Sequence, residues 1–256
     1  MEIKDSKIKN SVVLITGADR GVGRAFVEEF LKADAGKIYL GMSRPEKMSG
    51  FSVEDQARLI PLQLDVTKAD QVRAAAKKAA DVSSLINNAG VLYKGSLLDK
   101  DRMEKARYEM NVNYFGLLDM VRAFVPVLEA NGGGVIVNMS SVAGLVAIPD
   151  LPTYSASKAA AHFLTIESCM ELREKGINIV GVYPGPIDTD TSHSTREQKV
   201  TPNDVARKTI KAIESGEHFI FPDPFLKDIY SVLHGSSERI TKKMGNVFPE
   251  QEVRAA

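Results

Sequence analysis

The sequence predicts an α/β fold in which a doubly wound, parallel sheet of seven strands carries helices on both faces. Three observations lead to this prediction. Short β-rich apolar runs recur along the chain, stretches with helical spacing separate them, and no linker, repeat or low-complexity tract divides the 256 residues. Right-handed crossovers turn such an alternation into an open, mainly parallel sheet. We therefore expect a single domain over residues 1–256.

The expected strands are short runs of apolar and β-branched residues bounded by turn signals. They cover residues 12–16, 37–42, 59–64, 85–87, 135–139, 177–183 and 218–221. Apolar residues at helical spacing predict helices near residues 22–30, 72–80, 103–128, 155–175 and 203–215. The last helix has its own start signal, because Thr201 offers an N-cap hydroxyl, Pro202 suits the first helical position and Asp204 follows three residues after the cap.

Composition excludes several classes of function. The 33 basic residues balance 33 acidic ones, so the charge that usually attracts nucleic acid or an anionic membrane is lacking. A single cysteine, Cys169, cannot form an internal disulfide and suits a reducing compartment. No apolar run is long enough to span a membrane, and no histidine has metal-site spacing. We expect a cytoplasmic protein with no metal site.

Open parallel sheets bind ligands beyond the carboxyl ends of their strands, and a glycine-rich loop follows the first expected strand. Residues 16–23 read Thr-Gly-Ala-Asp-Arg-Gly-Val-Gly and lead directly into a helix. Glycines let the backbone turn tightly and approach a pyrophosphate, whose charge the N–H groups of the helix start can receive. Phe26 stands where the G-x-G-x-x-G fingerprint has its third glycine. The position of the loop still favours a nucleotide site.

The second expected strand ends where a dinucleotide site contacts the adenosine ribose. An NAD site favours a carboxylate there, whereas this chain has Ser43 and Arg44. An exposed arginine at a strand end is common and would mean little alone, but Arg20 lies inside the glycine loop. Two guanidinium groups would suit a 2′-phosphate, so we expect NADP(H) as the coenzyme.

A tyrosine and a lysine lie one turn apart at the start of the fourth expected helix. Tyr154 and Lys158 share one helical face, and Ser141 follows the fifth strand. A phenol is a poor acid or base at neutral pH, and we expect the neighbouring ammonium to lower the pKa of Tyr154. A serine hydroxyl could bind the substrate oxygen on which charge develops. The Tyr-x-x-x-Lys spacing alone is weak, because it is common by chance.

Taken together, these motifs resemble the short-chain dehydrogenase/reductase family over residues 11 to 221. The resemblance is specific because six motifs occur in the family's order and after the expected strands. They are the glycine loop, Asn87-Asn88-Ala89-Gly90, Asn113, Ser141, the Tyr154 and Lys158 pair, and Pro184-Gly185. The resemblance implies a Rossmann-type fold, with residues 222–256 serving substrate or subunit contacts.

The resemblance also implies roles for four residues. Tyr154 would be the acid/base, and Lys158 would tune it and bind the nicotinamide ribose. Ser141 would orient the carbonyl; it is preferred to Ser140 because the family's serine lies thirteen residues before the tyrosine. Asn113 would anchor a water relay to the lysine, since a glycine follows it three residues later, and Asn111 is the less favoured alternative.

The remaining residues that the resemblance implies are coenzyme contacts after successive strands. Asp65 could equally cap the helix that begins near Lys68, and the segment after the fourth strand could be a simple turn. The expected coenzyme contacts are Gly17, Arg20, Gly21, Val22, Gly23, Ser43, Arg44, Asp65, Val66, Asn87, Ala89, Gly90, Tyr154, Lys158, Pro184, Gly185, Ile187 and Thr189.

The expected function is the reversible reduction of a ketone or aldehyde to an alcohol with NADPH. One alternative is a catalytically silent NADPH-binding sensor or scaffold of the same fold, against which the intact motif residues argue. A sugar-nucleotide epimerase or dehydratase would need a larger substrate region than the 35 residues after Phe221. The residues do not define the substrate beyond a small carbonyl or alcohol. By resemblance we expect a homodimer or homotetramer, formed through helices 103–128 and 155–175.

Overall fold

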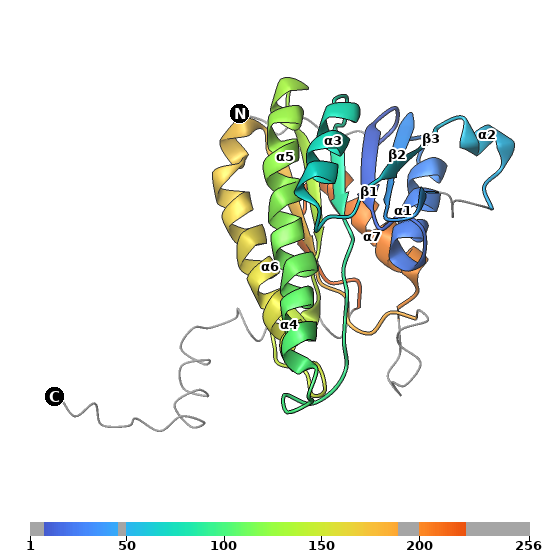
Figure 1. The fold of residues 1–256 in the computed structure, drawn as a ribbon. Helices are drawn as coiled ribbons and strands as arrows, with labels where there is room; N and C mark the ends of the chain where they lie inside the picture. The colour runs from blue at the N-terminus through green and yellow to red at the C-terminus, as the bar shows by residue number, and fades with distance from the viewer. Residues whose placement is uncertain (1–7, 46–49, 189–199, 224–256) are drawn as a thin grey trace.

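The computed structural model describes residues 8–45, 50–188 and 200–223 of the chain. Seven parallel strands form one sheet in the order β3-β2-β1-β4-β5-β6-β7, with helices on both faces, which confirms the predicted fold class (Figure 1). The strands are β1 (Val12–Thr16), β2 (Lys37–Met42), β3 (Leu59–Gln63), β4 (Ser84–Asn87), β5 (Gly134–Met139), β6 (Ile177–Val182) and β7 (Phe219–Ile220). The strand order reverses between β1 and β4, so a ligand site is expected beyond the carboxyl ends of these two strands.

All seven predicted strands are present, and their bounds differ from the prediction by a residue or two. β7 is the shortest, with two residues where four were expected. Leu64 lies just beyond β3, but its backbone N–H still donates to the carbonyl of Met42 at 2.8 Å. Beyond residue 223, the expected C-terminal region lies outside the described residues, so its role stays a prediction.

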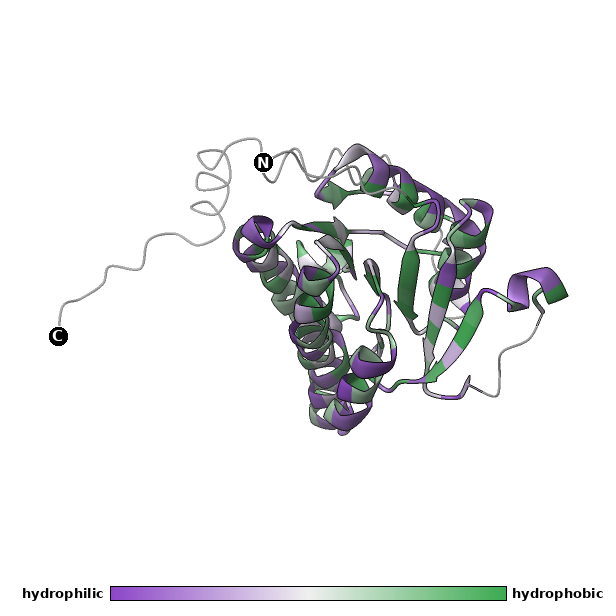
Figure 2. Ribbon diagram, turned by 90° about the horizontal axis from the view of Figure 1, so that it is seen from above, coloured by the Kyte–Doolittle hydropathy of each residue, from purple (hydrophilic) through white to green (hydrophobic). Residues whose placement is uncertain are grey.

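Side chains alternate along each strand between two hydrophobic clusters, one on each face of the sheet. In β1, Val13 and Ile15 pack on the face covered by α1 (Gly21–Lys32) and α7 (Pro202–Ser215). Leu14 packs on the opposite face, beneath α3 (Ala69–Lys78), α5 (Leu117–Ala130) and α6 (Pro152–Glu171). Figure 2 shows the hydrophobic strands enclosed between helices whose polar residues lie mainly outward.

The start of α7 confirms the predicted capping signal. The Thr201 hydroxyl accepts a hydrogen bond from the backbone N–H of Asp204 at 3.1 Å, and Pro202 occupies the first helical position. Two short helical turns were not predicted, α2 (Val53–Gln56) and the 3₁₀ turn η3 (Val142–Gly144). The 3₁₀ turn η4 (Arg173–Lys175) lies at the end of the helix predicted over residues 155–175. Among the described helices, none is both long and apolar enough to cross a membrane.

The helix predicted over residues 103–128 is continuous in the structure, but it contains a π-helical segment that the sequence did not indicate. The structure has α4 (Arg102–Met110), then a π-helical segment, η2 (Asn111–Gly116), and then α5, which together form one long column beside α6 (Figure 1). A π-helix has a wider turn than an α-helix and accommodates an extra residue without ending the helix, so a hydrophobic pattern does not reveal it. Gly116 fits here because a Cβ would lie 2.7 Å from Cγ2 of Val66.

Candidate active site

The glycine loop folds closely on itself beside the end of β2. The backbone N–H of Gly17 donates to the carbonyl of Gly41 at 2.8 Å. Gly17 and Gly21 have φ angles of +64° and +54°, which glycine adopts without strain. A Cβ on Gly23 would lie 1.9 Å from the carbonyl oxygen of Gly17, so no larger residue fits there. These three glycines are therefore required by the shape of the loop.

The loop presents the start of α1 in a form that fits a pyrophosphate. Arg20 is the N-cap residue but does not cap the helix with its side chain, and the first turn contains no acidic residue. The first N–H groups of the helix, which include those of Gly21 and Val22, are thus offered to an anion. The chemistry of these donors fits the charged middle of a nicotinamide dinucleotide.

The residues expected to select the coenzyme lie at the same edge of the sheet. Arg20, Ser43 and Arg44 are exposed to solvent. The Gln63 side chain donates to the carbonyl of Ser43 at 2.9 Å and so fixes the backbone just beyond β2. Because the glycine loop is bonded to Gly41, both arginines belong to neighbouring chain segments. Together, Arg20, Arg44 and Ser43 offer two cations and a hydroxyl, and position 43 lacks the carboxylate that an NAD site favours.

A buried hydroxyl connects β1 to the segment after β4. Thr16 is 1% exposed, and its Oγ1 accepts hydrogen bonds from the backbone N–H groups of Asn88 and Ala89, each at 2.9 Å. The Asn88 amide in turn donates to the carbonyl of Thr16 at 2.9 Å. These bonds fix the segment at the point where the strand order reverses.

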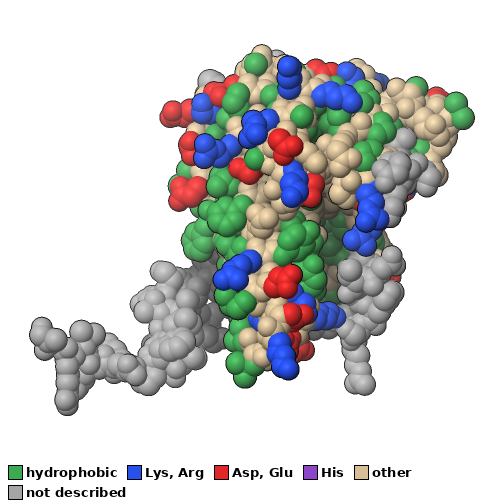
Figure 3. Space-filling view, viewed as in Figure 1, with side chains coloured by type: hydrophobic (Ala, Val, Ile, Leu, Met, Phe, Trp, Pro, Cys, Tyr) green, Lys and Arg blue, Asp and Glu red, His purple; other side chains and the backbone are tan. Residues whose placement is uncertain are grey.

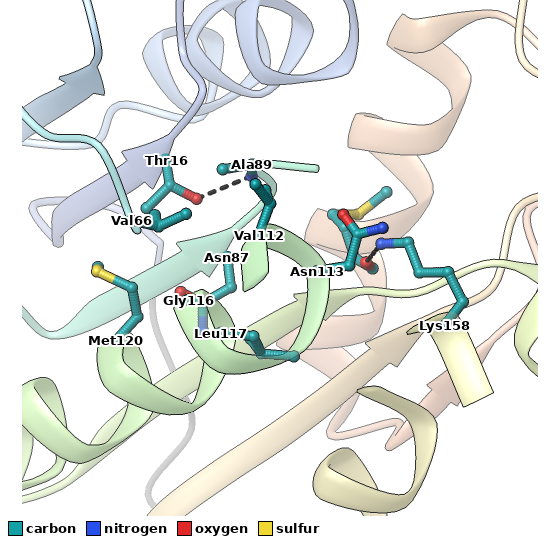
Figure 4. Close-up of a pocket in the computed structure, with 11 residues that line it drawn as sticks. Thr16, Val66, Asn87, Ala89, Val112, Asn113, Gly116, Leu117, Met120 and Lys158 are labelled. Atoms are coloured by element: carbon teal, nitrogen blue, oxygen red, sulfur yellow. Dashed lines mark hydrogen bonds between the residues drawn. The ribbon is translucent and has the colours of Figure 1, made fainter. Parts of the chain in front are cut away.

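A small cavity lies between the strand ends and η2 (Figure 4). Of the expected site residues, it brings together Val66, Asn87, Ala89, Asn113 and Lys158. These come from the segments after β3 and β4, from the end of β4 itself and from two helices. The remaining lining is Thr16, Val112, Gly116, Leu117, Met120 and Met139. The other expected site residues that the structure describes do not line this cavity.

Asn113 lies within the π-helical segment and is 2% exposed. Its amide donates to the carbonyl of Val91 and to Ser157 Oγ, each at 2.9 Å, and its Oδ1 accepts from the N–H of Val91 at 2.9 Å. Ser157 continues the chain of bonds to the carbonyl of Tyr154 at 2.8 Å. Asn113 thus joins the segment after β4 to α6, and its expected role in a water relay stays a prediction.

Asn87 belongs to a second buried polar chain, which the sequence did not indicate. Its amide donates to Asn138 at 3.0 Å, and the Asn138 amide donates to Thr165 Oγ1 at 3.1 Å. The chain crosses from β4 through β5 to α6, and all three residues are buried. It fixes the helix that carries Tyr154 and Lys158 against the sheet.

Tyr154, Lys158 and Ser141 come together beyond the carboxyl end of β5. The Lys158 ammonium lies 5.9 Å from the centre of the Tyr154 ring and donates to the carbonyl of Met139 at 2.7 Å. The Ser141 hydroxyl lies close enough to the Tyr154 phenol to act on its pKa. Ser141 Oγ also accepts from the N–H of Ala143 at 3.2 Å, whereas the hydroxyl of Ser140 is buried without a partner among the described residues.

The expected lowering of the Tyr154 pKa is absent in this structure. Burial raises the pKa of Tyr154 to about 12, the nearby Ser141 hydroxyl lowers it and the negative charge of Glu109 raises it further. Burial likewise lowers the pKa of Lys158 to about 8. The prediction was wrong in direction because it considered the neighbouring charge and left out the desolvation of both groups.

The segments after β5 and β6 lie against each other beside this cluster. The carbonyl of Pro184 accepts from the N–H of Val142 at 3.1 Å and from the Ser141 hydroxyl at 3.5 Å. Further along the chain, Ile187 forms a short parallel bridge with Val200. Gly185 lies in the chain between Pro184 and Ile187. Thr189, an expected coenzyme contact, lies outside the described residues.

Asp65 stabilises its own turn after β3. Its Oδ1 accepts from the backbone N–H and the hydroxyl of Thr67, at 2.9 and 2.7 Å. The N-cap of α3 is Lys68, with no side-chain cap, so Asp65 shapes the approach to the helix and does not cap it. Val66 is buried against Gly116, and Gly90 lies close to Asn113 and Lys158. The coenzyme contacts expected of Asp65, Val66 and Gly90 stay predictions.

Comparison with known proteins shows the family to which the chain belongs. A family model described as short chain dehydrogenase matches residues 11–200. A dehydrogenase/reductase SDR family member 7B from Xenopus tropicalis is 30% identical over 233 residues, covering 80% of this chain and 75% of that protein.

Two solved structures extend the comparison. A short chain dehydrogenase from Burkholderia cenocepacia in complex with NADP superimposes with a TM-score of 0.85 at 35% identity, covering 96% of this chain and 100% of that chain. A short chain dehydrogenase/reductase from Burkholderia phymatum in complex with NAD gives a TM-score of 0.78 at 26% identity, covering 93% and 96%.

The chain therefore belongs to the short-chain dehydrogenase family. It is an oxidoreductase that acts on alcohols or carbonyls with a nicotinamide coenzyme.

Proposed function

We propose that this protein is an NADP(H)-dependent carbonyl reductase in which Tyr154 is the acid/base. The observation that carries the proposal is the cluster beyond β5, where the Tyr154 phenol lies 5.9 Å, ring centre to ammonium, from Lys158 and close enough to Ser141 for that hydroxyl to act on its pKa. An acid, a cation and a hydroxyl gathered in one place suit the reduction of a carbonyl to an alcohol.

The bound coenzyme supplies the hydride. Ser141 orients the carbonyl oxygen of the substrate, and Tyr154 gives that oxygen a proton as the alcohol forms. Lys158 binds the nicotinamide ribose and stabilises the phenolate left on Tyr154. This stabilisation lowers the pKa of Tyr154 and so opposes burial, which raises it. Asn113 keeps Lys158 and the segment after β4 in place through its bonds to Val91 and Ser157.

The preference for NADP(H) is supported by the exposed pair Arg20 and Arg44 and by the absence of a carboxylate at Ser43. A carboxylate would repel a 2′-phosphate, whereas two guanidinium groups can form charge-assisted hydrogen bonds with it. The relative at 35% identity binds NADP and the one at 26% binds NAD. We expect NADPH to be preferred at least tenfold, as a single such bond of about 1.5 kcal/mol would give.

The experiment is a panel of ketones and aldehydes incubated with the protein and NADPH, with coenzyme oxidation followed by absorbance. Reduction of at least one carbonyl, at a higher kcat/KM with NADPH than with NADH, is expected. NADPH binding without turnover of any member of the panel would contradict the proposal and favour a silent sensor or scaffold.

We also propose that the protein is a homodimer or homotetramer that associates through α4, η2 and α6. Figure 3 shows hydrophobic side chains on the face formed by these helices and α5. Several of these hydrophobic side chains are exposed: Phe115 of η2 is 52% exposed, and Phe163 and Met170 of α6 are 65% and 61% exposed. Phe124 of α5, in contrast, is buried in the core. Light scattering at micromolar concentration tests this, and a monomer would contradict it.

A further inference from the structure

Two buried charged side chains on α4 hold the segment that follows β4, and neither belongs to the site described so far. Glu109 is 0% and Arg102 is 3% exposed. They lie seven residues apart, so they face the same side of the helix as Asn113, which lies four residues after Glu109. This side of the helix faces residues 91–96 and the start of α6.

The three side chains bind the backbone of residues 91–96 in sequence. Asn113 binds both polar groups of Val91, and Glu109 Oε1 accepts from the N–H of Tyr93 at 2.8 Å. The Arg102 guanidinium donates to the carbonyls of Tyr93, Lys94 and Ser96 at 3.1, 3.0 and 2.8 Å. The segment thus gains from side chains the hydrogen bonds that a neighbouring strand would otherwise supply.

The glycine in this segment makes room for the arginine. Gly95 has a φ of +137°, and a Cβ there would lie 2.2 Å from Nη2 of Arg102. Its N–H donates to the carbonyl of Asp150 at 2.9 Å, which connects the segment to the approach to α6. Arg102 also reaches α6 itself, where Thr153 Oγ1 lies 3.4 Å from Nη1.

Glu109 has a feature that holding the loop does not explain. Its second oxygen, Oε2, is buried and has no hydrogen-bond partner among the described residues. Holding Tyr93 needs only one acceptor, which the amide of a glutamine would also supply. A neutral side chain would therefore suffice for the loop. The carboxylate instead lies between Arg102, which reaches Thr153, and Asn113, which binds Ser157, and thus faces the turn of α6 that carries Tyr154.

We propose that Glu109 is a positioning residue for the reaction at Tyr154, which fixes the backbone of residues 91–96 and holds a negative charge against the phenol. The proposal rests on the proposed function of Tyr154 as acid/base. It is supported by the effect of Glu109 on the pKa of Tyr154, which its charge raises. The charge of Glu109 thus opposes the stabilisation of the phenolate by Lys158, so Tyr154 stays protonated up to a higher pH than it would without Glu109.

The other charged groups on the segments around Tyr154 do not replace Glu109 in this role. They are Lys158 on α6, Arg102 on α4, Lys94 after β4, Asp150 before α6 and Asp188 after β6. Glu109 is the buried acid of this set, since Asp150 and Asp188 are both exposed. Among the described residues, it is therefore the acid whose charge opposes ionisation of Tyr154.

The substitution Glu109→Gln separates the two parts of the proposal, because it keeps an acceptor for Tyr93 and removes the charge. Glu109→Ala removes both, and Glu104→Gln, an exposed carboxylate on the same helix, is the matched control. The first measurement is the pH dependence of kcat/KM for the reduction of 4-nitrobenzaldehyde with NADPH. The second is hydrogen exchange of the Tyr93 amide, which needs no turnover.

In Glu109→Gln we expect the alkaline loss of activity to begin about half to one pH unit lower than in the wild type, because the phenol ionises more easily. The Tyr93 amide should stay protected in this variant and exchange at least ten times faster in Glu109→Ala. The Glu104→Gln protein should match the wild type in both measurements.

An unchanged pH profile in Glu109→Gln, or a protected Tyr93 amide in Glu109→Ala, would overturn the proposal. Should the wild type reduce no carbonyl, the proposed function fails by that result alone. The role of Glu109 is then decided by ¹³C NMR of labelled tyrosine, in which Tyr154 is assigned from Tyr154→Phe. Earlier onset of phenolate in Glu109→Gln supports the charge effect, and an identical titration removes it.

Discussion

Lys158 donates a hydrogen bond from its ammonium to the backbone carbonyl of Met139 at 2.7 Å, in a place that is almost fully buried. This bond turns the lysine toward the end of β5, where Ser141 follows two residues later. Burial of a cation is unfavourable, and the pKa of Lys158 falls to about 8 as a result. The coenzyme-free protein therefore carries a charge at neutral pH that its own interior disfavours.

Substitution of Lys158 by Met should stabilise the coenzyme-free protein at pH 7. Each pKa unit corresponds to about 1.4 kcal/mol, so the gain should be on the order of 2 kcal/mol after the lost bond to Met139 is allowed for. Urea unfolding measures it, with the exposed Lys77→Met as the matched control. Equal stability of wild type and Lys158→Met at pH 7 would contradict a buried cation.

The stability of the wild type should rise with pH between about 8 and 9, level off up to about 10 and fall above that. The unfolded chain binds the Lys158 proton more strongly than the folded protein, whose pKa is about 8 against 10.5, so removing protons favours folding in this window. The rise ends near pH 9 because burial raises the pKa of the Cys169 thiol to about 11, so the folded protein holds that proton while the unfolded chain releases it. Above pH 10 the unfolded tyrosine ionises while Tyr154 holds its proton up to about 12, which favours unfolding. Unfolding curves across pH should show the rise, and Lys158→Met should lack it.

Tyr154→Phe should lose at least 99% of kcat for carbonyl reduction and keep its affinity for NADPH. It removes a proton donor whose contribution is about 10²- to 10⁴-fold but only one of the many expected coenzyme contacts, and Lys158 remains to bind the ribose. Steady-state kinetics and coenzyme fluorescence measure the two effects. More than about a tenth of the wild-type kcat would refute the assignment of the acid/base.

Three companion substitutions sharpen the test of Tyr154. Lys158→Ala should lose both turnover and coenzyme affinity. Tyr39→Phe also removes a phenol, but one at β2 that donates to Asp81 at 2.9 Å, and it should stay active. His162→Gln should stay active as well, because the imidazole is buried one turn beyond Lys158 and contacts Tyr183, 2.7 Å from its hydroxyl.

The combined substitution Ser43→Asp and Arg44→Ala should shift the coenzyme preference toward NADH. It adds a carboxylate that can accept hydrogen bonds from the ribose hydroxyls, and it removes one of the two cations proposed to bind the 2′-phosphate. The ratio of kcat/KM for NADPH to that for NADH should fall at least tenfold. Equal use of both coenzymes by the wild type, or an unchanged ratio in the variant, would rule out the proposed preference.

Thr16→Val should weaken both the fold and coenzyme binding. It preserves shape but leaves the N–H groups of Asn88 and Ala89 without their acceptor, and each buried unpaired group costs about 1 to 3 kcal/mol. We expect a loss of about 2 to 4 kcal/mol in urea unfolding, with weaker NADPH binding. Thr16→Ser, which keeps the hydroxyl, should lie within about 1 kcal/mol of the wild type. Equal losses in both variants would assign the effect to the methyl group.

The strands could be predicted because a parallel sheet covered on both sides buries continuous apolar runs, as in Ile177–Val182. The motif residues could be located because they follow those strands directly, as Thr16 and Asn87 illustrate. The π-helical segment could not, since Asn111–Gly116 continues a helical pattern on either side. The four-residue α2 is too short to leave a periodic signal.

The pKa of Tyr154 and the role of Glu109 were missed for a shared reason. Both depend on burial, which a sequence motif does not report. A signal for Glu109 was present, because an acid four residues before Asn113 lies on the same helical face as that buried asparagine. Arg102, a further seven residues back, continues the same face. A search for charged residues on the same helical face as the buried Asn113 would have identified both Glu109 and Arg102.

The π-helical segment determines which side of α4 faces residues 91–96, because it sets the rotation of α4 about its axis relative to α5. Each residue of an α-helix turns the chain by about 100°, so deleting one residue between 111 and 116 would rotate α4 about its axis relative to α5 by that amount. Arg102 and Glu109 would then face away from residues 91–96, while the apolar stripe of α5 stayed in register with the sheet. A substitution at Arg102 or Glu109 removes only the hydrogen bonds of that side chain. Deletion of one residue from η2 would remove the contacts of both side chains with residues 91–96 at once.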